Sequence, residues 1–192
     1  MSWYTLALFA HILGVIGLFV GLSFTLASAL RLRQARTAAQ VREGASGVGI
    51  QRGLVPIASL LILLAGIYMT VVAWDWAPPW ILVSLAALIV MGVLGAVSAR
   101  RLEAIKKAAA EVSGEAIPPA LKRQLADPVL LTAVLTACAV GLGVVFLMTT
   151  KPDLIGSLIA LAAALVLGVV SALFWRRPAE ARALVEEAAP GA

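Results

Sequence analysis

The chain has 192 residues, of which 62% are hydrophobic and only 13% are charged. Its mean hydropathy of +1.02 lies outside the range of soluble domains, which are roughly half apolar and a quarter charged. This composition predicts an all-α integral membrane protein in the lipid bilayer. The net charge of +5 does not indicate nucleic-acid binding, because the basic residues flank apolar segments, where membrane orientation explains them.

Five apolar runs are long enough to cross, as helices, a hydrocarbon core about 30 Å thick. They carry no charged residue and cover residues 3–30, 54–73, 80–99, 129–149 and 154–175. We predict one transmembrane domain over residues 1–192, a five-helix bundle with residues 176–192 as a short cytoplasmic tail. The first run lacks a basic segment before it and is too long for a signal peptide, so we expect it to remain attached.

Basic residues predict the orientation of these helices. Fourteen of the fifteen Lys and Arg residues lie after the first, third and fifth runs, and only Lys151 lies between the fourth and fifth. Since short cytoplasmic loops are rich in Lys and Arg, we expect the N-terminus outside and the C-terminus inside. The expected outer surface carries an aromatic belt of Trp3, Tyr4, Trp74, Trp76 and Trp80.

The segments between the runs are short and polar. Residues 34–53 include Gly44, Gly47 and Gly49 and predict a flexible loop. Residues 100–112 predict a cytoplasmic continuation of the third helix, and Asp127 before Pro128 is a start signal for the fourth. We expect none of these segments to bury a core of its own.

An internal repeat relates two of the helices. Residues 80–101 match residues 153–174 at ten of 22 positions. This similarity predicts a parallel duplication in which helices 2 and 3 correspond to helices 4 and 5. Shared membrane composition is the alternative explanation.

Small residues recur along one face of three helices. They are Ala7, Ala10, Gly14, Gly17, Gly21, Thr25 and Ser28 in the first, Ala87, Gly95 and Ala99 in the third, and Gly156, Ala160, Ala164, Gly168 and Ala172 in the fifth. Because helices in lipid approach closely where side chains are small, we predict that these faces meet each other or a partner, as a homo-oligomer or with another membrane protein. A substrate path along them is the alternative.

His11 is the only histidine and the only readily ionisable side chain within a run. Its helical position borders Gly14 and Gly21, so it is expected to face the bundle, where a polar group is a candidate for function. Three roles stay open: a neutral imidazole bonded to a backbone carbonyl or to a hydroxyl such as Thr70, a ligand of haem or metal, and a proton-transfer group.

Ligation by His11 would need further ligands. Met69 and Met148 lie near the outer ends of their helices, and thioether with imidazole suits copper or haem iron; packing is the alternative for both. Cys138 is expected to be an inert apolar residue, and Asp75 a solvated carboxylate. A single cysteine excludes a disulfide framework, and no catalytic triad or paired carboxylates occur, so no catalytic residue is assigned.

Several short motifs carry a family resemblance. They are Ala10-His11-Ile12-Leu13-Gly14 with Gly17, then Pro56, Gly66-Ile67-Tyr68 and Arg100-Arg101. With them the chain resembles an uncharacterised bacterial family of predicted integral membrane proteins with a histidine in the first helix, similar in outline to the copper-resistance protein D and HemJ-type protoporphyrinogen oxidase families. The resemblance implies a bacterial inner-membrane bundle of four spans with His11 as the family histidine. The lack of an intramembrane lysine departs from the HemJ pattern and argues against that activity.

Two classes of function follow. The first is a non-enzymatic membrane component or accessory subunit of a larger complex, favoured by the small-residue faces and the scarcity of polar groups. The second is a haem- or copper-binding membrane protein that uses His11 in the outer leaflet. A transporter is a third possibility and would need a dimer to form a path.

Overall fold

The computed structural model describes residues 2–46 and 48–187, and all regular elements in those ranges are α-helices. In chain order they are α1 (Trp3–Gln34), α2 (Ala38–Ser46), α3 (Val48–Ala73), α4 (Pro79–Ala110), α5 (Pro119–Ala126), α6 (Pro128–Thr150) and α7 (Leu154–Glu187). Five of them, α1, α3, α4, α6 and α7, are long and apolar enough to cross a membrane. The predicted all-α class and the five spans are confirmed.

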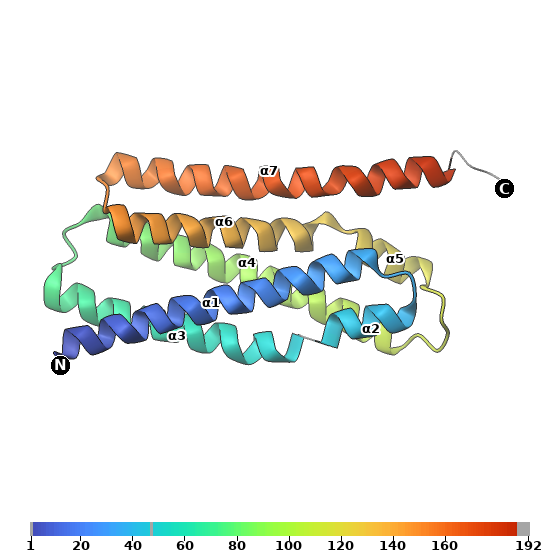
Figure 1. Cartoon of the computed structure of the whole chain (residues 1–192), viewed down its shortest axis with the longest axis horizontal. Coiled ribbons are helices and arrows are strands. Elements are labelled where there is room, and N and C mark those ends of the chain that lie inside the picture. The colour runs from blue at the N-terminus through green and yellow to red at the C-terminus, as the bar shows by residue number, and fades with distance from the viewer. Residues whose placement is uncertain (1, 47, 188–192) are drawn as a thin grey trace.

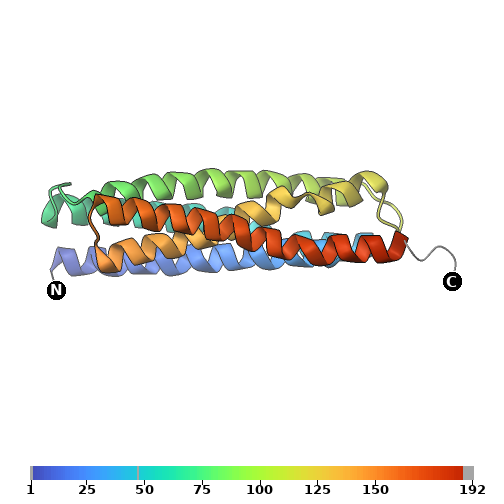
Figure 2. The same cartoon turned by 90° about the horizontal axis from the view of Figure 1, so that it is seen from above.

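The five long helices run along a common axis, with α2 and α5 gathered at one end (Figure 1; Figure 2). We call this the basic end, since α1, α2, α4, α5 and the α1–α2 connection bring ten cationic side chains there. They are Arg31, Arg33, Arg36, Arg42, Arg100, Arg101, Lys106, Lys107, Lys122 and Arg123. The opposite, aromatic end holds the start of α1 and the α3–α4 and α6–α7 connections. Which end faces the cytoplasm stays a prediction from the charge distribution.

Side-chain caps set the first residues of two helices. Ser2 accepts a hydrogen bond from the Thr5 backbone N–H at 3.2 Å, and Asp127 accepts one from Val129 N–H at 2.9 Å. Such caps satisfy donors that the helix itself leaves unpaired. The sequence-based start of the fourth span at Asp127 is therefore confirmed.

The polar segment after α1 is a helix and not the flexible loop that its glycines predicted. Ala38, Val41 and Ala45 of α2 are completely buried, and they follow the helical spacing that places residues on one face. Val41 and Ala45 join a hydrophobic core with Leu102 of α4 and Leu121 of α5. The same core contains residues of α1 and α6, so α2, α5 and the extension of α4 pack against the spans and do not form a separate core. Gly47 lies outside the described residues.

The packing order departs from that of two equivalent hairpins. α1 packs along α3, while α6 packs along both α4 and α7. The consecutive helices α3 and α4 make few contacts, whereas the consecutive helices α6 and α7 pack along much of their length. The sequence repeat therefore has no matching pair of hairpin interfaces in the fold.

The small-residue faces of α1 and α7 pack against different helices. A Cβ on Gly14 would lie 2.9 Å from Ile62 Cγ1, so the α1 face is filled by α3. A Cβ on Gly168 would collide with Cα of Thr136, so the α7 face is filled by α6. Each face is covered by another helix of the same chain, which leaves neither open to an external partner.

Candidate functional site

His11 is the buried polar group of the α1–α3 interface. Its side chain is 7% exposed, and its Nδ1 lies 3.0 Å from the backbone carbonyl oxygen of Ile62 on α3. Two glycines make this contact possible. Gly14 lets the two backbones approach, and Gly66 leaves space for the ring, since a Cβ there would lie 3.4 Å from His11 Cε1.

The hydrogen bond determines the tautomer of the neutral ring. A carbonyl oxygen only accepts hydrogen bonds, so Nδ1 of His11 donates its N–H to Ile62. The neutral imidazole then carries its lone pair on Nε2. This nitrogen is the one atom of the site that is suited to accept a proton or to ligate a metal.

Thr70 is close to this site but bonds within its own helix. Its hydroxyl donates to the carbonyl oxygen of Gly66 at 2.8 Å, one helical turn earlier in α3. Of the two structural partners considered for His11, the backbone carbonyl is the one that it contacts.

The two methionines lie at similar depths in the bundle. Met69 is three residues beyond Gly66 on α3, or about 4.5 Å along the axis. On α6, Gly141 lies against Phe19 of α1, and these helices are antiparallel (Figure 1). Counting eight residues along each helix places His11 level with Thr149, the neighbour of Met148. Both methionines are partly buried, and whether either ligates a metal stays a prediction.

The other candidate groups lie apart from His11. Cys138 is half-buried and packs between the two hydrophobic clusters of the bundle. Asp75 is exposed in the α3–α4 connection. Across residues 2–46 and 48–187, no three His, Cys, Asp or Glu side chains come together as a metal-binding group. A metal at His11 would thus depend on thioether sulfur or on groups from another molecule.

Ser84 is a buried polar residue that the sequence analysis did not identify as a candidate. It is 4% exposed, and its hydroxyl has no hydrogen-bond partner among the described residues. Met91 of α4 lies against Gly141, so seven residues along each antiparallel helix bring Ser84 level with Met148. A second polar group therefore lies at the depth of His11, on α4.

Side-chain contacts link the two interhelical connections at the aromatic end, beyond the depth of His11 and Ser84. The Lys151 Nζ lies 4.5 Å from the centre of the Trp74 ring, a cation–π contact. Trp74 in turn packs edge-on against Trp80, with ring centres 5.5 Å apart. Lys151 thus links the α3–α4 connection to the α6–α7 connection.

Sequence reasoning identified His11 but missed the residues that hold it. Ile62 is an ordinary apolar residue whose carbonyl becomes a partner only through the register of α1 against α3. Gly66 did leave a signal, because an isolated glycine inside a helical run often marks a packing contact. Comparing the spacing of Gly14 and Gly66 on two antiparallel helices is the step that would have paired them.

Comparison with known families supports the membrane assignment. A family model described as "Predicted integral membrane protein (DUF2269)" matches residues 5–152. The matched region contains α1 to α6 and ends before α7 begins at Leu154. No curated protein and no solved structure matches the chain.

Proposed function

Because the chain belongs to this family of predicted integral membrane proteins (DUF2269), we propose that it is a non-enzymatic membrane component that acts by binding another transmembrane helix. The observation that carries the proposal is an uncovered small-residue face on α4. We call Gly92, Gly95, Ala96 and Ala99 the α4 outer face.

The α4 outer face differs from the small-residue faces of α1 and α7. A Cβ built on Gly92 or Gly95 meets no atom of the described residues within 4 Å, and Ala96 and Ala99 are exposed. The buried side of α4 is instead formed by Ala87 and Met91. The predicted stripe of Ala87, Gly95 and Ala99 is thereby divided, with its first member inside the bundle and the other two outside.

A second copy of the chain is the partner that fits this face. Gly92 with Ala96 and Gly95 with Ala99 repeat the small-xxx-small spacing of closely packed membrane helices. Two parallel copies related by a twofold axis along the membrane normal would present the same residues to each other. We therefore propose that the chain forms a homodimer in the bacterial inner membrane and serves as an accessory subunit of a larger complex.

Cysteine cross-linking in membranes tests the dimer. In a Cys138→Ala background, Gly92→Cys is expected to give a disulfide-linked dimer on mild oxidation. Leu167→Cys, at a residue that is 61% exposed on α7, is the matched control and is expected to stay monomeric. Equal cross-linking at both positions, or none at Gly92→Cys, would contradict the proposal.

Topology is tested separately, because the proposed cytoplasmic location of the basic end rests on the distribution of Lys and Arg. Reporter fusions at the two chain termini should report opposite sides of the membrane, with the N-terminus outside. Both termini on one side would mean that one of the five helices does not span.

A haem- or copper-binding protein is the second candidate, and one observation favours it. Metal-ligating histidines usually donate their other ring N–H to a carbonyl or carboxylate, which is the bond from His11 Nδ1 to Ile62. Met148 at the same depth, or Met69, would supply sulfur, in keeping with the resemblance to the copper-resistance protein D and HemJ-type families.

The absorption spectrum and metal content of the purified protein separate the two candidates. Ligation predicts a Soret band or stoichiometric copper that His11→Ala removes while the helix content is unchanged. A colourless, metal-free protein after growth with haem precursor and copper would exclude this second candidate and leave the dimer proposal intact.

A further inference from the structure

Arg33 near the end of α1 stands apart from the other cations of the basic end. It is only partly exposed and lines a small cavity with Ala29, Leu131 and Asp127. Within residues 2–46 and 48–187 it makes no ion pair and no side-chain hydrogen bond. A guanidinium that is partly withdrawn from water and has no protein partner is available to bind an anion.

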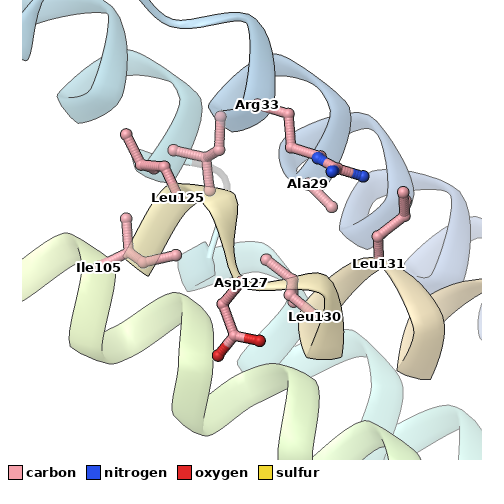
Figure 3. A pocket seen from close by; sticks show the side chains of 8 residues that line it. Ala29, Arg33, Ile105, Leu125, Asp127, Leu130 and Leu131 are labelled. Carbon is pink, nitrogen blue, oxygen red and sulfur yellow. The ribbon is translucent and has the colours of Figure 1, made fainter. Parts of the chain in front are cut away.

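The nearest carboxylate is already engaged. Asp127 forms an ion pair with Arg101 of α4 and also caps α6 by accepting the Val129 N–H at 2.9 Å. Figure 3 shows the Asp127 carboxylate directed towards α4 and the Arg33 guanidinium directed past Ala29 towards Leu131, on the other side of the cavity. Arg101 therefore neutralises Asp127, and Arg33 is left for another anion.

The direction of the Arg33 side chain fixes the depth of that anion. Arginines near the end of a membrane helix usually extend towards water, but this one lies back along α1 beside Ala29, the preceding turn (Figure 3). Ala29 is buried and belongs to the uncharged part of α1. The guanidinium is thus level with the boundary between apolar chain and headgroup, where phospholipid phosphates lie.

The charges around Arg33 favour one class of phospholipid. The segments of the basic end, residues 31–46 and 100–127, hold ten Lys and Arg residues against five Asp and Glu residues. Arg31 and Arg36 are exposed beside Arg33 and would repel the cationic group of a zwitterionic headgroup. Net positive potential at the membrane surface favours anionic lipid.

We propose that Arg33 binds the phosphate of an anionic phospholipid in the leaflet at the basic end. The guanidinium fork matches the geometry of two phosphate oxygens. The cavity itself, with room for about one water, is too small for a headgroup, so the phosphate lies at its mouth beside α1 and α6.

Lipid titration of the purified protein in detergent, followed by native mass spectrometry, tests this site. Phosphatidylglycerol is expected to bind the wild type more tightly than phosphatidylcholine does. Arg33→Gln should weaken phosphatidylglycerol binding about tenfold, the effect of losing one charge-assisted contact. Arg31→Gln removes the same charge two residues away from an exposed position and should change binding less than about twofold.

Four results would overturn the proposal. Equal losses in Arg33→Gln and Arg31→Gln would indicate diffuse attraction, and equal binding of both lipids would remove the anionic preference. Inorganic phosphate that competes with phosphatidylglycerol at equal concentration would assign the site to free phosphate. If Arg33→Gln does not fold, Arg33→Lys keeps the charge without the fork, and unchanged phosphatidylglycerol affinity in that variant would likewise contradict the proposal.

Discussion

The α1–α3 and α6–α7 interfaces use the same packing device with different results. In both, a glycine brings two helix backbones together, Gly14 against α3 and Gly168 against α6. The first interface encloses the imidazole of His11 in a hydrogen bond, whereas the second buries the hydroxyl of Thr136 with no partner among the described residues. Close approach of two helices alone thus does not create a candidate site. A site forms where a buried polar side chain is also hydrogen-bonded to a backbone carbonyl of the neighbouring helix.

The two interfaces also differ in their relation to the family. The region matched by the family model includes all of the described α1–α3 interface except the first two residues of α1, but only one side of the α6–α7 interface. α7 adds a span to the four in the matched region. Through its glycine face, α7 therefore packs as an additional helix against the matched bundle. The α1–α3 interface belongs to the matched bundle itself.

Gly168→Leu should have the largest effect on stability, because the new side chain would collide with the backbone of Thr136, which cannot move aside. We expect a loss of about 3 kcal/mol, measured by thermal unfolding in detergent. Leu167→Ala, at the neighbouring lipid-facing residue, is the control and should cost much less because lipid replaces the lost contacts. Similar losses in the two variants would place the α7 packing face elsewhere.

His11→Ala should cost about 2 kcal/mol, because the buried ring and its hydrogen bond to Ile62 are lost. His11→Asn, which retains a donor at a shorter reach, is expected to recover part of this loss. Unfolding of the three proteins in the same detergent gives the comparison. A fully stable His11→Ala variant would show that the α1–α3 interface does not depend on its polar group.

Two glycine substitutions across the α1–α3 interface should show the smallest and most selective effects. Gly14→Ala places a Cβ 3.0 Å from the Ala58 backbone oxygen and is expected to cost about 1 to 2 kcal/mol. Gly66→Ala makes only ordinary contact with the His11 ring, at 3.4 Å, and should lie within about 1 kcal/mol of wild type, since alanine also favours the helix. Reversal of this order would contradict the described register.

Sequence reasoning succeeded where composition and period carry the information. The five spans, the start at Asp127 and the inward position of His11 all follow from local residues. α2 was missed because its four buried residues are interspersed with polar ones in a glycine-containing segment, so that average polarity concealed the helical spacing.

The division of the α4 small-residue stripe into a buried and an exposed part could not be predicted from the sequence, for a different reason. Ala87 and Gly95 are equally small, and only the rotation of α4 against α6 decides that one is buried and the other open. The partner of His11 depends in the same way on the register of α1 against α3. Such relations between helices are tertiary properties that one sequence does not encode in any single segment.

The oligomeric state of the purified protein tests the central claim most directly. Native mass spectrometry in detergent should find two copies of the 19.9 kDa chain. Gly95→Leu should convert the dimer to a monomer without loss of helix content, because a Cβ at this position would meet no side chain of the described residues. A monomeric wild type, or a dimer that persists in Gly95→Leu, would contradict the proposal that the α4 outer face binds a second copy.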